Sequence, residues 1–434
     1  MYRCCIEKLI DWKNDPYRQP LILNGARQVG KTWLMKEFGE KYFNDYIYIN
    51  FDNNDDMKNI FSGNITPNHI IRELEIYFQK KITKETLIIF DEVQESPRAL
   101  SSLKYFAEDA PEYYVICAGS FLGLALHEGT NFPVGKVDFL EIHPMTFIEF
   151  LLAFGNEDYV NIIRERKYDY MKDFKNFYIR KLKEYFLVGG MPRVVQIFVE
   201  TEDYKRVRGE QNKIFQTYKN DFSKHAKSGA TPKILDVWQS IPEQLSKENN
   251  KFQYKTIKEG SRASDYEYAL LWLRDCGLIK IINRISSYKI PIEPYKEKNV
   301  FKVFINDIGL LSNMAKISPK TILQGNDIFV EFKGALTEQY VCQELIALKD
   351  LNLAYYNKSQ CEIDFIGDYE NVVFPIEVKA NINLRAKSLN LFMEKYKPPF
   401  GVRTSLSDYK ETENLIDIPL YAISQIINII EEKV

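Results

Sequence analysis

The sequence predicts an α/β fold with a parallel β-sheet that carries a phosphate-binding loop. Within residues 1–150, short apolar stretches that read as buried strands alternate with helical patterns, and this alternation is typical of parallel sheets. One such stretch, residues 21–23, leads directly into Gly25 and Gly30 and then into a helical pattern. Strand, glycine-rich loop and helix in this order indicate a P-loop NTPase fold.

The loop itself has the spacing G-x-x-x-x-G-K-[ST], and it consists of Gly25, Ala26, Arg27, Gln28, Val29, Gly30, Lys31 and Thr32. In this spacing the glycines let backbone N–H groups surround phosphates, the lysine reaches the outer phosphates and the threonine hydroxyl meets Mg²⁺. Large apolar residues recur at helical spacing from Trp33 to Tyr42, so a helix N-terminus, which favours a bound anion, follows the loop. We therefore expect residues 25–32 to bind a nucleotide.

Further strands are expected at residues 46–51, 86–90, 114–118 and 137–140, with a helix near residues 70–78. The second of these strands ends in Asp91 and Glu92. At the carboxyl edge of the sheet that holds the loop, Asp91 would bind Mg²⁺, directly or through water, and Glu92 would polarise the attacking water. The alternative is that the two acids only cap the next helix.

The strand at 114–118 leads into Gly119 and Ser120. A serine at this edge would lie beside the outer phosphate and sense its hydrolysis. Serine is also a favoured N-cap, so a helix that begins at Phe121 explains it equally well.

Length and composition favour a folded multidomain protein. A chain of 434 residues exceeds the size of most single cores, so two or three domains are expected. No apolar stretch is long enough to span a membrane, and no signal peptide begins the chain, which predicts a cytoplasmic protein without a membrane partner. The six cysteines and four histidines lack zinc-ligand spacing, which argues against a zinc site.

Five segments together resemble one known group: GARQVGKT, IIFDEVQESP, ICAGS, EIHPMTFIEF and YFLVGGMP. They resemble the prokaryotic AAA-like ATPases that carry a C-terminal domain of uncharacterised function, and the resemblance runs over nearly the whole chain. It implies that Gly25, Gly30, Lys31 and Thr32 bind ATP phosphates. It also implies that Asp91 coordinates Mg²⁺ and that Glu92 activates water.

One departure concerns the arginine finger. The group has Gly-Arg before the last strand of the sheet, whereas this chain has Gly135 and Lys136. Lysine lacks the planar, bidentate fork of arginine. Arg193, or no finger at all, are the remaining alternatives.

ATP is expected in preference to GTP, because no N-K-x-D tetrad follows the loop. The dipeptide Asn357-Lys358 continues as Ser359-Gln360.

A middle segment, 201–315, reads as helix, turn, helix and hairpin, which predicts a winged helix. From 204 to 298 it holds 19 Lys and Arg against 11 Asp and Glu. Such an excess could contact the phosphate backbone of DNA or RNA, or an acidic partner, and in a winged helix Arg262, Ser264 and Tyr266 near the start of a helix could face a nucleic-acid groove. A solvated face that is balanced in three dimensions explains the excess equally well. A protein-docking module or a plain spacer are the alternatives.

The C-terminal segment, 316–434, resembles the PD-(D/E)xK nuclease fold. Its chemistry needs two acids on adjacent strands to hold Mg²⁺ and a lysine two residues past the second acid. By this resemblance Asp364 and Glu377 would bind metal, Lys379 would position water, and Glu338 would complete the acidic group. Metal-assisted phosphodiester cleavage is the implied reaction. Ordinary strand alternation explains E-x-K equally well.

The leading hypothesis is therefore a Mg²⁺-dependent ATPase in residues 1–200, which regulates or powers a nuclease-like domain and forms oligomers if a finger acts in trans. The alternatives are an ATP-dependent molecular switch and a partner-docking ATPase, either of them with an inactive nuclease-like domain.

Overall fold

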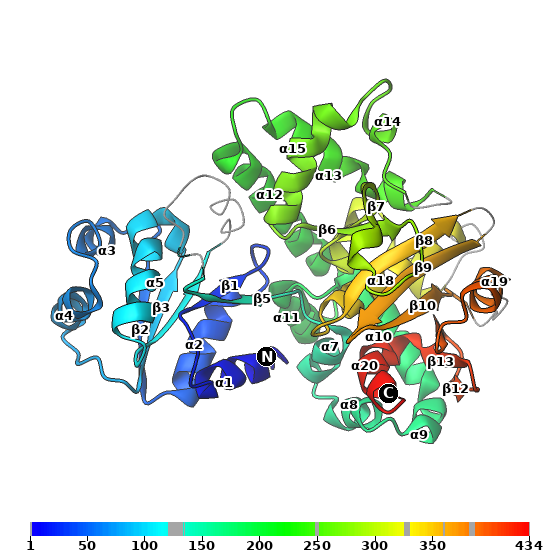
Figure 1. Ribbon diagram of the computed structural model, residues 1–434, viewed down its shortest axis with the longest axis horizontal. Helices are drawn as coiled ribbons and strands as arrows, with labels where there is room; N and C mark the ends of the chain where they lie inside the picture. Colours follow the sequence, from blue (N-terminus) through cyan, green and yellow to red (C-terminus); the bar gives the residue numbers. More distant parts are fainter. Residues whose placement is uncertain are drawn as a thin grey trace. The chain divides into compact units, whose positions relative to one another are not determined.

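The computed structural model describes residues 2–119, 133, 135–247, 251–324, 330–358, 361–381 and 387–433. The chain forms two compact units. The first holds residues 2–143 with 275–278, and the second holds 144–274 and 279–433 (Figure 1). Ser120 lies outside the described residues. The predicted boundaries at 200 and 315 stay predictions.

The first unit contains the expected parallel sheet. Its five strands lie in the order β2-β3-β4-β1-β5, and every neighbouring pair is parallel. Strand β4 lies between β1 and β3 and is parallel to both, so the carboxyl ends of all three strands lie at the same edge of the sheet. The strands are β1 (Leu21–Asn24), β2 (Asp45–Asn50), β3 (Thr86–Asp91), β4 (Tyr114–Ala118) and β5 (Asp138–Glu141).

Helices cover this sheet, and local signals fix several of their starts. Ser96 caps α5 by accepting a hydrogen bond from the Ala99 N–H, and Pro97 occupies the first turn. Asn54 caps α3 in the same way through the Met57 N–H. The helices and the single 3₁₀ turn described in this unit are α1 (Ile6–Asn14), α2 (Lys31–Tyr42), α3 (Asp55–Ile60), α4 (Pro67–Phe78), η1 (Val93–Glu95) and α5 (Pro97–Asp109).

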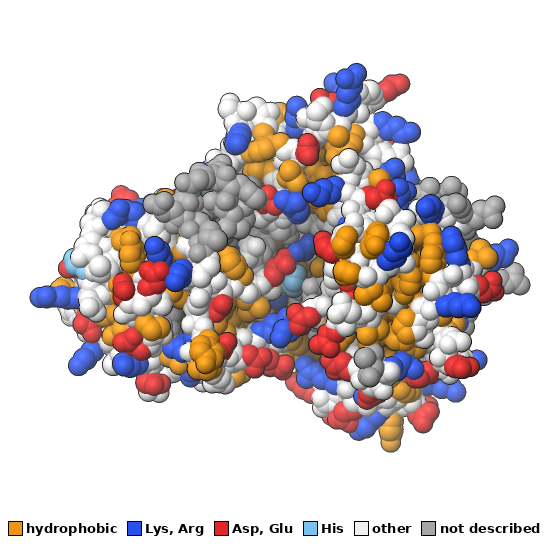
Figure 2. Space-filling view, in the orientation of Figure 1, with side chains coloured by type: hydrophobic (Ala, Val, Ile, Leu, Met, Phe, Trp, Pro, Cys, Tyr) orange, Lys and Arg blue, Asp and Glu red, His pale blue; other side chains and the backbone are white. Residues whose placement is uncertain are grey.

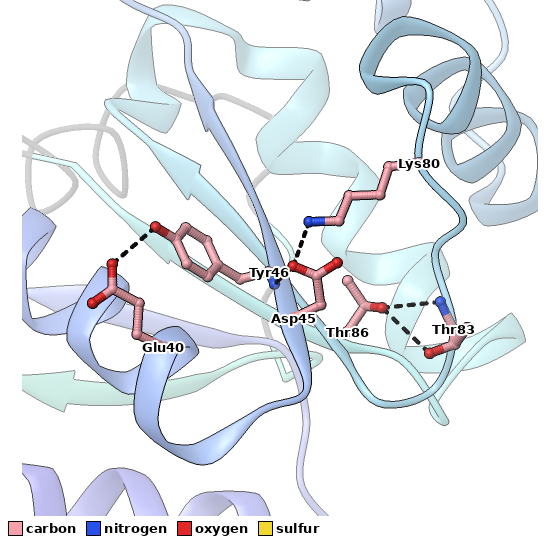
Figure 3. Close-up of polar contacts among 6 residues, drawn as sticks. All are labelled: Glu40, Asp45, Tyr46, Lys80, Thr83 and Thr86. Carbon is pink, nitrogen blue, oxygen red and sulfur yellow. Dashed lines mark hydrogen bonds and ion pairs between the residues drawn. The ribbon is translucent and has the colours of Figure 1, made fainter.

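Polar contacts fix the amino ends of β2 and β3. Lys80 pairs with Asp45 at the first residue of β2, and the Thr83 N–H donates to Thr86 Oγ1 at 3.0 Å at the first residue of β3 (Figure 3). In a parallel sheet the amino ends lie opposite the carboxyl ends. These contacts therefore hold the strands from the edge that faces away from the phosphate-binding loop.

The second unit combines many helices with an eight-stranded sheet of order β12-β13-β11-β10-β9-β8-β6-β7. Its strands are β6 (Ile279–Ile285), β7 (Lys296–Ile305), β8 (Asn352–Lys358), β9 (Cys361–Tyr369), β10 (Val372–Val378), β11 (Gly401–Ser405), β12 (Lys410–Glu411) and β13 (Leu415–Pro419). The helices before β6 are α7 (Phe147–Ala153), α8 (Glu157–Arg164), α9 (Tyr168–Asp173), α10 (Lys175–Val188), α11 (Pro192–Thr201), α12 (Tyr204–His225), α13 (Thr231–Leu245), α14 (Tyr254–Ile257) and α15 (Ala263–Asp275). The later helices are η2 (Glu293–Tyr295), α16 (Ile308–Met314), α17 (Pro319–Gln324), α18 (Val330–Ile346), α19 (Lys387–Tyr396), η4 (Leu420–Gln425) and α20 (Ile426–Glu431).

The hairpin expected in the middle segment is present, but it is part of the C-terminal sheet and not a separate structure. β6 and β7 pair in the antiparallel sense, and β6 also pairs with β8 in the parallel sense, at Arg284 and Tyr355. The hairpin therefore extends the C-terminal sheet (Figure 1). Whether α13, α14, α15 and the hairpin constitute a winged helix stays a prediction.

Two glycines of the YFLVGGMP segment allow close backbone packing. Gly190 exchanges backbone contacts with Met145, whose N–H donates to the Gly190 carbonyl at 2.7 Å. The Gly190 N–H donates to Asp307 Oδ2 at 2.6 Å. A Cβ at Gly190 would overlap the Met145 carbonyl oxygen, and one at Gly189 would overlap the Asp307 carboxylate. This segment is a packing element of the second unit.

Helix α18 carries a buried carboxyl group toward α7. Glu344 Oε1 accepts the Phe147 N–H at 2.8 Å, at the first residue of α7. Burial raises the pKa of Glu344 from 4.5 to about 8, so the folded state holds this proton more tightly than the unfolded chain. Its contribution to stability is complete below the unfolded pKa and is lost as the pH rises through 8.

Replacing Glu344 with glutamine tests this pH dependence. Glutamine keeps the acceptor oxygen and does not titrate. Between pH 5 and 8 the wild-type free energy of unfolding is expected to fall, relative to Glu344→Gln, by about 1.4 kcal/mol per pH unit. Urea unfolding at several pH values measures the difference. Glu394→Gln, at an exposed position of α19, is the charge-matched control and is expected to track the wild type. Parallel curves for wild type and Glu344→Gln would contradict the assignment.

Candidate nucleotide-binding site

The predicted phosphate-binding loop joins β1 to α2 in the first unit. Gly25 has φ +143° and Gly30 has φ +93°, values that a residue with a side chain rarely adopts. A Cβ at Gly25 would also overlap the carbonyl oxygen of Ile142. Between the glycines, Gln28 takes a left-handed φ of +69°. The loop therefore has the tight, glycine-dependent turn that the spacing predicts, and it ends at the N-terminus of α2.

Lys31 is the first residue of α2, and its side chain folds back over the loop. Its Nζ donates to the Gly25 carbonyl at 2.8 Å and to the Ala26 carbonyl at 3.0 Å. Burial lowers the pKa of Lys31 from 10.5 to about 8, although the nearby carboxylates of Glu92 and Asp91 oppose this effect. An anionic phosphate at the loop would stabilise the ammonium form.

The two predicted Mg²⁺ ligands are in direct contact. Thr32 Oγ1 donates to Asp91 Oδ2 at 2.7 Å, across 59 residues of sequence. Tyr48, from β2, donates its hydroxyl to the same oxygen at 2.8 Å. Burial and the Asp91 carboxylate raise the pKa of Tyr48, so the phenol stays a donor. Asp91 is therefore held between the loop helix and the neighbouring strand.

Glu92 follows Asp91 in an uncommon backbone conformation. Its φ is +50°, in the left-handed region, where non-glycine residues are rare and where strain often accompanies function. The Glu92 N–H donates to Asp91 Oδ1 at 3.1 Å, and Gln94 Nε2 donates to Glu92 Oε2 at 2.6 Å. The Asp91 and Glu92 side chains therefore leave the backbone in different directions, and the hydrogen bond from Gln94 orients the Glu92 carboxylate.

Two supporting residues carry no recognisable signal in the sequence. Arg3 is buried and donates to the Val29 carbonyl at 2.7 Å and to the His143 carbonyl at 2.6 Å, so it ties the loop to the strand that ends the sheet. Tyr48 is the other. Tyr48 reaches the site because β2 lies beside β3, and Arg3 because the segment before α1 packs against the loop. Apolar patterns specify neither arrangement.

Replacing Tyr48 with phenylalanine is expected to weaken ATP binding in the presence of Mg²⁺. The change removes one hydrogen bond to a carboxylate, worth about 1.5 kcal/mol, which corresponds to roughly tenfold in affinity. Calorimetric titration with a non-hydrolysable ATP analogue measures it. Tyr46→Phe is the matched control, since Tyr46 lies on the same strand and its hydroxyl contacts only Glu40 in Figure 3, at 3.2 Å. Equal affinity for Tyr48→Phe and wild type would contradict this role.

The candidate finger residues have local partners. Lys136 forms an ion pair with Glu108 at 3.1 Å. Arg193 is exposed in the first turn of α11 and donates to Gln196 at 3.0 Å. An exposed arginine is available to a neighbouring copy of the chain, so Arg193 remains the candidate.

In the second unit, the four predicted C-terminal residues lie together. Glu338 belongs to α18, Asp364 to β9 and Glu377 to β10, which pairs with β9; Lys379 follows β10 directly. Asp364 Oδ2 accepts the Val378 N–H at 2.7 Å, and Lys379 Nζ contacts Glu377 Oε1 at 2.5 Å. The four residues that the sequence predicts to form one site therefore lie close together in the structure. The roles in catalysis stay predictions.

A residue outside the prediction completes this group. Lys302 of β7 donates to Glu338 Oε1 at 2.7 Å and lies 3.7 Å from Glu362 Oε1. We call Glu338, Glu362, Asp364 and Glu377 the acidic cluster. Burial raises the pKa of each of its three glutamates. Burial would lower the pKa of Lys302, but the surrounding carboxylates raise it above its ordinary value, so the ammonium stays charged.

The predicted nucleic-acid contacts of the middle segment are only partly accessible. Arg262 and Ser264 are exposed near the start of α15. Tyr266 is 6% exposed and donates to Asp236 Oδ2 at 3.3 Å, so the expectation that it faces a groove is wrong. On the face shown in Figure 2, Lys and Arg side chains are interspersed with Asp and Glu.

Comparison with known sequences identifies the first unit. Residues 17–151 match a family described as an AAA domain, which agrees with the sheet, the loop and the acid pair. This segment is an AAA-like P-loop domain. Residues 179–321 and 333–423 match two families described as domains of unknown function, DUF8612 and DUF4143. No curated protein matches the chain.

Distant similarity to solved structures adds no detail. The chain is similar to the Walker-type ATPase PABY2304 of Pyrococcus abyssi, with 16% identity over 71% of this chain and 94% of that one and a TM-score of 0.44. It is also similar to Orc1 of Aeropyrum pernix in complex with DNA, with 12% identity over 72% of this chain and 90% of that one and a TM-score of 0.28. A third similar structure is AMPPCP-bound DnaA of Aquifex aeolicus, with 14% identity over 62% of this chain and 86% of that one and a TM-score of 0.28. These TM-scores are too low to transfer site geometry or function.

In the part of the chain that the structure describes, no helix combines the length and apolar character needed to cross a membrane. None of the six cysteines, all of which are among the described residues, forms a disulfide bond.

Proposed function

We propose that the first unit binds ATP with Mg²⁺ and hydrolyses it. The contact between Thr32 Oγ1 and Asp91 Oδ2, at 2.7 Å, carries this proposal. It brings the hydroxyl of the phosphate-binding loop to the carboxylate that follows β3. A hydroxyl and a carboxylate at the N-terminus of a helix suit Mg²⁺, which takes its remaining oxygen ligands from water and phosphate.

Each residue of the site has one task in this proposal. The backbone N–H groups of residues 25–30 and the N-terminus of α2 bind the phosphates. Lys31 exchanges its bonds to loop carbonyls for bonds to the outer phosphate. Glu92 accepts the proton of the attacking water, and Gln94 holds the carboxylate in place. Bound Mg²⁺ supplies positive charge to the phosphate oxygens where negative charge develops.

A further part of the proposal concerns what ATP hydrolysis does to the second unit. The resemblance to a nuclease fold expects two acids on adjacent strands, and the pairing of β9, which carries Asp364, with β10, which carries Glu377, supports that resemblance. The exposed Arg262 supports contact with DNA or RNA. The alternative is an ATP-driven switch that changes the affinity of the second unit for a partner. The pairing of Lys302 with Glu338 supports only its inactive nuclease-like domain.

Equilibrium binding tests the nucleotide part of the proposal. Fluorescent ATP and GTP analogues, each with and without Mg²⁺, are expected to show a preference for ATP and tighter binding with Mg²⁺. Lys31→Ala is expected to lose this binding. Equal affinities for the two nucleotides would contradict the choice of ATP, and binding that Lys31→Ala leaves unchanged would exclude the loop as the site.

A further inference from the structure

Lys302 places a full positive charge inside the acidic cluster. Its side chain is 0% exposed and reaches Glu338 Oε1 at 2.7 Å. The Tyr355 ring of β8 encloses it from another side, with its centroid 5.0 Å from Nζ. A lysine is almost never buried to this degree unless it is paired. The Lys302 ammonium is therefore a fixed cation inside the acidic cluster and not a mobile surface charge.

Two further carboxylate oxygens of the acidic cluster also have partners. Lys379 contacts Glu377 Oε1, and the Val378 N–H occupies Asp364 Oδ2. Glu377 Oε2 is buried and has no hydrogen-bond partner among the described residues. Because Lys302 pairs with Glu338 and Lys379 with Glu377, two of these carboxylates already have a cationic partner in place of a metal ion, whereas Mg²⁺ demands oxygen ligands in octahedral geometry.

A divalent cation does not fit these residues. Mg²⁺ shared between Asp364 and Glu377 would meet the positive charges of Lys302 and Lys379. The Lys302 side chain is fully buried and that of Glu377 is 7% exposed, so water screens this repulsion weakly. Among the described residues, no group of three or more His, Cys, Asp and Glu side chains is arranged to hold a metal ion. The metal expected from the nuclease resemblance and the side chains present therefore disagree.

We propose that the Lys302 ammonium stands in place of a divalent cation, so that the acidic cluster holds the β6–β7 hairpin against the C-terminal strands and does not take up Mg²⁺. The ion pair then joins β7 to α18 and β9. The second unit is consequently expected not to cleave phosphodiester bonds through this cluster. This inference is independent of ATP hydrolysis by the first unit.

Manganese binding to the full-length chain without nucleotide tests the proposal. Free Mn²⁺ is followed by electron paramagnetic resonance for wild type, Lys302→Met and Lys298→Met. Lys298 is the matched control, since it is exposed on the same strand. Lys302→Met is expected to gain one Mn²⁺ per chain, bound at least about tenfold more tightly than by wild type, while Lys298→Met matches wild type. A folded Lys302→Met variant without this gain would overturn the proposal.

A second arm keeps the test decisive if Lys302→Met does not fold. Wild type and Asp364→Asn are titrated with Mn²⁺ and incubated with DNA and with RNA. The proposal expects no difference between the two in Mn²⁺ binding and no cleavage by either. Saturable Mn²⁺ binding, or cleavage, that is present in wild type and lost in Asp364→Asn would overturn it.

Discussion

Replacing Glu92 with glutamine is expected to stop ATP turnover while leaving ATP binding intact. Glutamine cannot accept a proton from the attacking water, and a positioned general base contributes at least about 100-fold to rate. The Thr32 and Asp91 contact, which supports Mg²⁺, does not involve the Glu92 side chain. Quenched reactions after mixing with radiolabelled ATP are expected to recover bound, unhydrolysed ATP from the variant.

Glu95→Gln is the control for this experiment, because it makes the same change of charge three residues away in η1. It is expected to hydrolyse ATP at the wild-type rate. A Glu92→Gln variant that turns over within threefold of wild type, threefold being about 0.65 kcal/mol, would remove Glu92 from the role of base.

Replacing Gly190 with alanine is expected to destabilise the second unit severely. A Cβ there would overlap backbone atoms of Met145, and neither backbone can move without breaking the bonds from Gly190 to Met145 and Asp307. Overpacking costs about 1–3 kcal/mol and occasionally more, and the upper end, about 3 kcal/mol, is expected against backbone atoms that cannot move away. Thermal unfolding of wild type and variant measures the loss.

Gly209 supplies the matched control. It lies inside α12, and a Cβ there would meet no atom within 4 Å. Alanine is a better helix former than glycine, so Gly209→Ala is expected to stabilise the chain by up to about 1 kcal/mol. The two substitutions are therefore expected to shift the unfolding temperature in opposite directions. A Gly190→Ala variant as stable as wild type would contradict the packing described for this segment.

Much of the first unit follows from sequence patterns. Apolar runs mark β3 and β4 because central parallel strands are buried on both faces, whereas β2, at the edge of the sheet, is buried at alternate residues. The loop and the acid pair are recognisable because their chemistry needs fixed residue types at fixed spacing. Tyr48 was not predictable, since its contact with Asp91 depends on β2 lying beside β3, where Asn50 pairs with Asp91.

The C-terminal site shows the same limit more strongly. The resemblance to the PD-(D/E)xK fold, with its E-x-K spacing, led to Asp364, Glu377 and Lys379, and these side chains do lie together. Lys302 precedes Asp364 by 62 residues, in a segment that was expected to form a separate hairpin. The pairing of β6 with β8 joins its hairpin to the C-terminal sheet, and the packing of α18 against β7 brings Glu338 to Lys302. A lysine within an apolar strand does not reveal which carboxylate will neutralise it.

Steady-state phosphate release tests most directly whether this protein is an ATPase. The chain is mixed with ATP and Mg²⁺, and released phosphate is followed for wild type and for Lys31→Ala in parallel. The proposal predicts release that requires Mg²⁺ and that Lys31→Ala abolishes. No release by wild type above the rate for ATP alone, or the same release by both proteins, would contradict it.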